Sequence, residues 1–123
     1  MLLNLDFSDN VPIYVQIRNQ IVMGIADGRL VAGEKLPTIR ALALEAGINM
    51  MTANKAYALL KQEGYIKTDR RSGVTVCADI KGQGVIYEKI KQGLKLLISE
   101  AKLSGVPEQE FTKLCSQIYN EQK

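Results

Sequence analysis

The sequence predicts a mostly helical protein with a small β-hairpin, and three features support this prediction. Residues 37–64 contain two segments with a helical spacing of apolar side chains, separated by a turn at Gly47. Two strand-like segments then flank a polar turn at 69–73. Two further amphipathic segments follow toward the C-terminus. We therefore expect an N-terminal domain at residues 1–78 and a helical tail at residues 79–123.

The first expected helix begins at Pro12, which suits the first turn of a helix because its ring presets the backbone angle φ. The helix should end at Asp27-Gly28, and its core-facing residues recur every fourth position as Ile13, Ile17, Ile21 and Ile25. A turn and a very short strand at Lys35-Leu36 should follow. Pro37 then keeps the chain extended before the next helix.

The next two helices should form a helix–turn–helix pair. Thr38 and Asn49 are candidate N-caps, because their side-chain oxygens can accept hydrogen bonds from unpaired backbone N–H groups. The inward-facing residues should be Leu42, Ala43 and Ala46 in the first helix and Ala53, Ala56, Tyr57 and Leu60 in the second. The exposed side of the second helix should then carry Met51, Asn54, Lys55 and Ala58.

A hairpin is expected after these helices. Residues 65–68 and 74–77 have the composition of strands, and the turn between them has Arg70 and Arg71 at its tip. A hairpin in this position is a wing, and a winged helix-turn-helix places its second helix in the major groove of DNA. The expected fold is thus a winged helix-turn-helix followed by a helical tail.

The tail should contain two helices. Glycines at 82 and 84 mark the best candidate boundary, and the segment 104–107 should separate the two helices. Pro107, followed by Glu108 and Glu110, suits the start of the second, because negative charge favours a helix N-terminus. Two helices enclose little apolar surface by themselves, so we expect a second copy of the chain to cover them and form a homodimer. The expected dimerisation residues are Ile90, Leu94, Leu97, Ile98, Ala101, Phe111, Leu114 and Ile118.

The predicted partner is a double-stranded DNA operator. A net charge of +3 is mild, but the stretch 50–75 holds five basic residues and two acidic ones. Recognition requires phosphate contacts for register and base contacts for sequence. Arg40 suits a phosphate contact near a helix start, Asn54 can pair with adenine and Lys55 with guanine, and the wing can reach a neighbouring minor groove. The candidate DNA-binding residues are Thr38, Arg40, Asn49, Met50, Met51, Thr52, Asn54, Lys55, Arg70, Arg71, Ser72 and Gly73.

The composition argues against an enzyme. The chain has no histidine and only two distant cysteines, Cys77 and Cys115, so the usual zinc ligands and the usual base for a nucleophile are missing. We expect no cofactor and no metal. Two alternatives stay open: a protein-interaction module that uses the winged helix, and a thiol-based sensor. Without a secretory segment or an apolar run of membrane-spanning length, a soluble cytoplasmic protein with no membrane partner is expected.

Several motifs resemble the GntR family of bacterial transcription regulators. They are Pro12-Ile13-Tyr14-Val15-Gln16-Ile17, Gly28-Arg29-Leu30, Gly33-Glu34-Lys35-Leu36-Pro37-Thr38-Ile39-Arg40 and Thr52-Ala53-Asn54-Lys55-Ala56-Tyr57, and they cover about residues 10–77. The short tail is similar to that of the YtrA-type subfamily. The resemblance implies a homodimer that binds a palindromic operator and represses genes, often those of ABC transporters. It assigns Arg40 to a phosphate, Asn49, Thr52, Asn54 and Lys55 to the recognition helix, and Gly73 to the wing; it identifies no effector.

The chain departs from the family pattern at the tip of the second helix. Met50-Met51 stands where the family commonly has arginine, or a Pro-Asn pair in this subfamily, and Arg71 replaces the usual first glycine of the wing. Methionine can contact thymine methyl groups but cannot donate a hydrogen bond to guanine. The target sequence should therefore differ from those of relatives.

Overall fold

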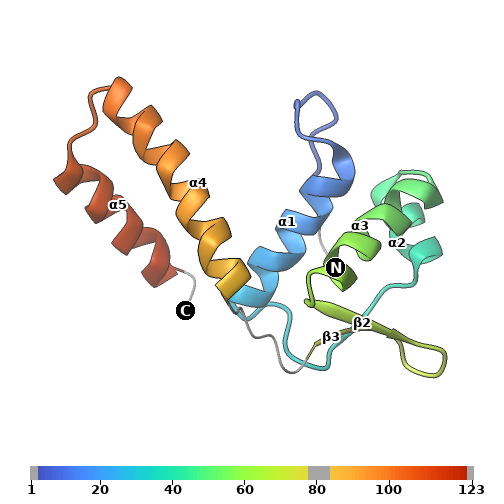
Figure 1. The fold of residues 1–123 in the computed structure, drawn as a ribbon. Coiled ribbons are helices and arrows are strands. Elements are labelled where there is room, and N and C mark those ends of the chain that lie inside the picture. The colour runs from blue at the N-terminus through green and yellow to red at the C-terminus, as the bar shows by residue number, and fades with distance from the viewer. Residues whose placement is uncertain (1–2, 78–83, 122–123) are drawn as a thin grey trace. The chain divides into compact units, whose positions relative to one another are not determined.

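A computed structural model describes residues 3–77 and 84–121 of the chain. The chain divides into two compact units, Met1–Ile80 and Lys81–Lys123 (Figure 1). The boundary expected from the sequence, between residues 78 and 79, lies outside the described residues. Within the described ranges the chain forms five helices and one three-stranded antiparallel sheet, which confirms the mostly helical fold class.

The first unit contains three helices and the sheet. Its elements are α1 (Ile13–Ala26), β1 (Lys35–Leu36), α2 (Ile39–Ala46), α3 (Met50–Gln62), β2 (Ile66–Asp69) and β3 (Gly73–Val76). The helices begin and end within a residue or two of the positions that the sequence predicts. Both strands of the hairpin differ from the prediction by one residue, because the ladder pairs Asp69 with Gly73 and Ile66 with Val76.

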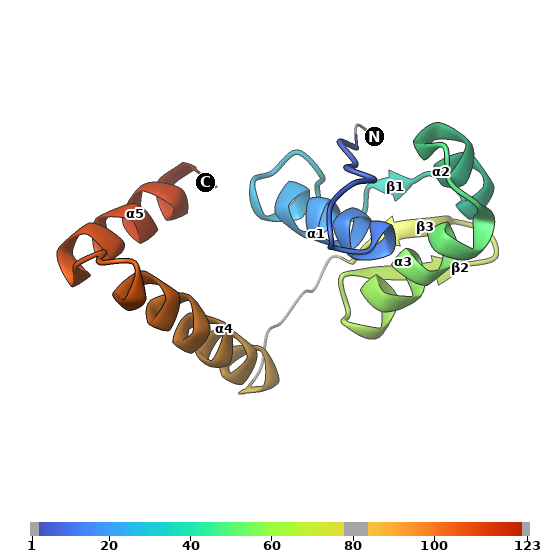
Figure 2. The same ribbon diagram turned by 90° about the horizontal axis from the view of Figure 1, so that it is seen from above.

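The sheet has the order β1-β3-β2, so the hairpin gains β1 as a third strand on its free edge (Figure 2). Lys35 pairs with Thr75, and Leu36 pairs with Val74. The backbone bonds continue past β1, since the Gly33 N–H donates to the Val76 carbonyl over 2.9 Å. The wing is thereby attached to the segment that leads into α2.

One hydrophobic core holds the three helices and the sheet together. The largest fully buried side chains come from all three helices and from β2 and β3: Ile17, Ile21, Leu42, Leu60, Ile66 and Val76. All four residues expected to face inward from α3 are buried, whereas Ala46 of α2 is only half-buried. The α1 stripe is also confirmed in part, since Ile13 and Ile25 pack against the core while remaining partly exposed.

Both predicted helix caps are present. The Thr38 hydroxyl oxygen accepts a hydrogen bond from the Ala41 N–H over 3.1 Å, and the Asn49 side-chain oxygen accepts one from the Thr52 N–H over 2.8 Å. Between the helices Gly47 adopts φ 69°, a left-handed conformation that residues with a Cβ atom avoid. The two caps and this glycine define the turn between α2 and α3.

Two glutamines of α1 hold the N-terminal segment 3–8 against the domain. Gln20 accepts from the Asn4 N–H over 2.8 Å and donates to the Asn4 carbonyl over 2.6 Å. Gln16 accepts from the Asp6 N–H over 2.8 Å and donates to the carbonyl oxygens of Asp6 and Val11, each over 2.8 Å. Leu3 and Leu5 consequently pack against the core.

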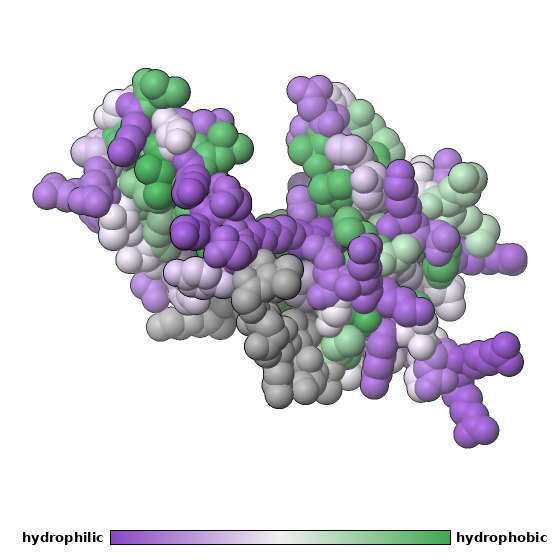
Figure 3. Space-filling view, viewed as in Figure 1, coloured by the Kyte–Doolittle hydropathy of each residue, from purple (hydrophilic) through white to green (hydrophobic). Residues whose placement is uncertain are grey.

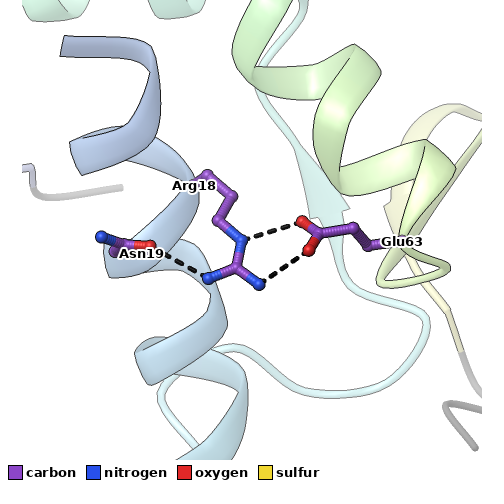
Figure 4. Close-up of polar contacts among 3 residues, drawn as sticks. All are labelled: Arg18, Asn19 and Glu63. Atoms are coloured by element: carbon purple, nitrogen blue, oxygen red, sulfur yellow. Dashed lines mark hydrogen bonds and ion pairs between the residues drawn. The ribbon is translucent and has the colours of Figure 1, made fainter. Parts of the chain in front are cut away.

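An ion pair connects α1 to the end of α3 (Figure 4). The Arg18 guanidinium donates to both carboxylate oxygens of Glu63, over 2.8 Å and 2.9 Å, and also to the Asn19 side chain over 2.9 Å. Only 15% of the Arg18 side chain and 19% of the Glu63 side chain are exposed. The hydrogen bonds that Arg18 donates to Glu63 raise the pKa of Arg18, which stays charged throughout the accessible pH range.

The second unit consists of α4 (Gly84–Leu103) and α5 (Glu108–Glu121), separated at the predicted break, where Gly105 adopts φ 80°. Many of its large apolar side chains are exposed, and Figure 3 shows apolar groups on its surface. A cleft of about 420 Å³ lies between the two helices, and its apolar lining includes Leu94, Ile98, Ala101 and Phe111. No helix in the described part of the chain has the length and apolar character needed to cross a lipid bilayer.

Candidate nucleic-acid interface

The start of α3 presents most of the expected base-reading side chains. Met51 is 82% exposed and Met50 is 49% exposed, and Asn54 and Lys55 are exposed on the next turn. Thr52 is half-buried, because it lies at the margin of the face that packs inward. The inward residues at positions 53, 56, 57 and 60 thus turn the polar and methionine side chains outward together.

The first turn of α2 presents Arg40. This side chain is exposed, and it follows Thr38, whose hydroxyl oxygen accepts the capping hydrogen bond while its proton stays available as a donor. Backbone N–H groups of a first helical turn have no partner within the helix, and together with a guanidinium they can bind an anion such as phosphate. This part of α2 therefore has the chemistry of a phosphate contact.

Tyr57 connects the middle of α3 to the segment just before α2, a role that the sequence does not indicate. Its ring is buried in α3, and its hydroxyl donates to the carbonyl oxygen of Pro37 over 2.7 Å. Burial, with the charge of Glu45 as a smaller contribution, raises the pKa of Tyr57, which keeps the hydroxyl protonated as a donor. The sequence predicts an inward position for this residue. A buried tyrosine hydroxyl usually has a hydrogen-bond partner, so a tyrosine at this position in place of leucine could have indicated one.

Lys55 has a partner that the sequence also does not reveal. Its ammonium nitrogen lies 4.5 Å from the centroid of the Tyr14 ring in α1, which is a cation–π distance. Tyr14 is half-buried and packs against the core. The positive charge of Lys55 thus lies beside the neighbouring helix α1.

The wing carries exposed arginines. Arg70, Arg71 and Ser72 are exposed in the turn between β2 and β3, and Figure 3 shows hydrophilic side chains projecting there. The turn is ordered by a hydrogen bond of 2.9 Å from the Arg71 N–H to the Asp69 carboxylate. Gly73, with φ 73°, begins β3 in a left-handed conformation. The arginine side chains consequently extend from a defined turn.

The first unit therefore presents three separate groups of candidate contacts: the first turn of α2, the first two turns of α3 and the tip of the wing. These are the three elements that a winged helix-turn-helix offers to DNA. In the described residues no cluster of three or more potential metal ligands occurs.

The family model for "Bacterial regulatory proteins, gntR family" matches residues 13–76, which include α1 through β3. The chain belongs to the GntR family. The HTH-type transcriptional repressor YtrA of Bacillus subtilis is 36% identical over 107 residues, which are 85% of this chain and 82% of YtrA. The YtrA-type resemblance seen in the sequence is thus confirmed.

The chain is also similar to solved structures of transcription regulators, in agreement with its membership of the GntR family. A transcriptional antiterminator from Listeria monocytogenes EGD-e superimposes with a TM-score of 0.88 at 28% identity, covering 96% of this chain and 90% of that one. The DNA-binding domain of AraR, solved in complex with the operator ORR3, gives a TM-score of 0.52 at 25% identity over 63% of this chain and 93% of that one. The family and these relatives are transcription regulators, in agreement with the prediction that the chain is not an enzyme.

Proposed function

We propose that this GntR regulator is a homodimeric repressor that binds a palindromic DNA operator. The observation that carries the proposal is the exposed start of α3, which lies in a GntR fold and projects two methionines, Asn54 and Lys55. The AraR domain, which the first unit resembles, has been solved in complex with an operator, and this supports DNA binding by the first unit. The rival function, a protein-interaction module, would use the same face without DNA.

Each candidate contact has a specific role in this proposal. Arg40 and the hydroxyl of Thr38 bind phosphates, and Asn54 reads adenine in the major groove. Lys55, next to Tyr14, contributes a phosphate contact or reaches a guanine. Arg70 and Arg71 follow the neighbouring minor groove. The other contacts come from Asn49, Met50, Met51 and Thr52 at the start of α3 and from Ser72 and Gly73 in the wing.

Dimerisation through α4 and α5 completes the proposal. Leu97 is 56% exposed, Ile90 54%, Leu114 52% and Ile118 47%. Apolar side chains in a hydrophobic core are far less exposed than this. A contiguous apolar face of this kind marks an interaction surface, and a second copy offers the same face. Two copies would present two α3 helices to successive major grooves about 34 Å apart.

The biological setting is proposed by analogy with the subfamily. YtrA of Bacillus subtilis bears the name of a repressor, which supports repression by this chain. Control of ABC transporter genes and a cytoplasmic location in a bacterium follow from the YtrA-type resemblance. No effector is assigned.

Binding selection tests the proposal directly. The 123-residue chain is incubated with random DNA duplexes at about 100 mM salt, and bound duplexes are amplified over several rounds. The mass of the free protein is measured by light scattering. We expect a dimer and enrichment of an inverted repeat with half-sites about one helical turn apart. Asn54→Ala should relax the preference at one base pair of each half-site, whereas Asn120→Ala in α5 should leave it unchanged. A dimer without any enriched sequence would support the protein-interaction module instead.

A further inference from the structure

The first turn of α3 is apolar at the place where a DNA-reading helix usually carries hydrogen-bonding groups. Met51 exposes 82% of its surface and Met50 exposes 49%. A thioether sulfur donates no hydrogen bond and accepts only weakly, so neither residue can read a guanine or a cytosine amine through polar contacts. What these side chains offer is flexible, polarisable apolar surface.

The nearby polar side chains are partly engaged within the protein. The side-chain oxygen of Asn49 accepts the capping bond from the Thr52 N–H over 2.8 Å. The Lys55 ammonium lies 4.5 Å from the Tyr14 ring centroid, beside α1. Of the residues at the start of α3, the methionines and the exposed Asn54 are therefore the ones best placed to reach bases.

The spacing of these residues places them on one face. Asn54 follows Met51 by three positions and Met50 by four, and residues with these spacings are neighbours on a helix surface. Asparagine pairs with the N6 and N7 atoms of adenine in the major groove. The only apolar group on a base edge in that groove is the C5-methyl of thymine. An adenine and a thymine methyl are thus the complement of this face.

We propose that Met51, together with Met50, recognises the C5-methyl group of thymine next to the adenine read by Asn54. The inference rests on the proposed function, because it requires α3 to enter a major groove. The recognised group is a methyl on a pyrimidine, so 5-methylcytosine meets the same requirement in part. This contact makes thymine preferred over unmethylated cytosine at that position of the operator.

Replacing thymine by deoxyuridine tests the inference, because it deletes one methyl group and leaves every hydrogen-bonding atom in place. The selected operator is synthesised with one deoxyuridine at a time, and affinity is measured by fluorescence anisotropy. The unmodified protein should lose about three- to fivefold in affinity per methyl group at one or two positions of each half-site. The affinity of the Met51→Ala variant should fall less than twofold when the same thymine is replaced by deoxyuridine, which is about the error of such titrations.

Two further variants control for unrelated effects. Met23→Ala removes a 43% exposed methionine from α1 and should retain the full sensitivity to deoxyuridine. Met51→Gln keeps the length of the side chain and should fold normally by circular dichroism while losing the methyl sensitivity. A duplex with 5-methylcytosine at the position of a sensitive thymine should bind the protein more tightly than a duplex with cytosine at that position.

Each outcome of these titrations has a defined meaning. A failure to enrich any sequence overturns the proposed function and this inference with it. Three results would overturn the methyl contact and leave the proposed function standing. The enriched operator could tolerate deoxyuridine at every thymine, its half-sites could contain no thymine, or deoxyuridine could weaken binding of Met51→Ala as much as binding of the unmodified protein.

Discussion

The hydroxyl of Tyr57 donates a 2.7 Å hydrogen bond to the carbonyl oxygen of Pro37, which connects the middle of α3 to the residue just before the α2 cap. Pro37 is half-buried, and buried or partly buried carbonyl groups in folded proteins are generally paired with a donor. This bond joins the segment that leads into α2, where Arg40 lies, to α3, so it contributes to the placement of the two helices relative to each other.

Tyr57→Phe should lower the free energy of unfolding by about 1 kcal/mol, because it leaves the Pro37 carbonyl without its partner. Urea denaturation monitored by circular dichroism measures this loss. The exposed Tyr119 of α5, changed to phenylalanine, is the matched control and should have no effect. An unchanged stability of Tyr57→Phe would mean that water replaces the phenol at no cost.

The same residue gives a pH dependence with a defined sign. Burial raises the pKa of Tyr57 above its ordinary value of 10.0, so the folded state resists ionisation that the unfolded state undergoes. The stabilisation is complete below about pH 10 and is lost as the pH rises further. The unfolding free energy should thus fall more steeply above about pH 10 in the unmodified protein than in Tyr57→Phe. Parallel curves would contradict the buried environment.

The ion pair between Arg18 and Glu63 should behave as a coupled, partly buried unit. We expect Arg18→Met and Glu63→Gln each to cost about 1–3 kcal/mol, since each leaves a charged or polar group with fewer partners. The double variant should lose less than the sum of the two, and denaturation of all four proteins measures the coupling energy. The pair formed by Asp27 and Arg29, whose arginine is 66% exposed, is the control and should show a much smaller coupling.

The glutamine contacts of α1 predict a further effect on stability. Gln16→Ala removes three hydrogen bonds to the backbone of Asp6 and Val11, so residues 3–8 should separate from the domain more often. Hydrogen exchange at the N-terminal amides should accelerate, with a loss of about 1–2 kcal/mol in unfolding free energy. Gln62→Ala, at the exposed end of α3, should change neither quantity. An unchanged rate of hydrogen exchange at the Asp6 amide would show that Gln16 does not hold residues 3–8 against the domain.

The sequence is informative where a single segment determines the outcome. Helix spans, the caps at Thr38 and Asn49 and the buried side of α3 depend on local spacing, which periodicity detects. The contacts that sequence reasoning missed join residues far apart in the chain, such as Tyr57 with Pro37 and Lys55 with Tyr14. These contacts depend on how segments distant in the sequence pack together, which no local pattern of residues encodes. The DNA and dimer contacts depend on absent partners and stay predictions.

Arg40→Ala should weaken DNA binding at every sequence to a similar extent. If its guanidinium binds one phosphate, the slope of log affinity against log salt should decrease in magnitude by about one. Anisotropy titrations at four salt concentrations, on the selected operator and on an unrelated duplex, measure the slope. Arg29→Ala, an exposed arginine outside the proposed interface, should retain the original slope. A loss confined to the selected operator would instead assign Arg40 to base recognition.

The tail provides the last prediction, because its apolar face must be covered for the two half-sites to be bound together. Leu97→Asp places a charge on a side chain that is 56% exposed in the single chain, so α4 should still form while the dimer dissociates. Affinity for the inverted repeat should fall about a hundredfold or more, because two linked half-site contacts become one. Analytical ultracentrifugation and anisotropy measure the two effects. Leu103→Asp, at a leucine that is 90% exposed and lies off the apolar stripe, should change neither. A Leu97→Asp variant that stays dimeric would place the dimer contact elsewhere, and a monomer that binds the full operator normally would remove the need for pairing.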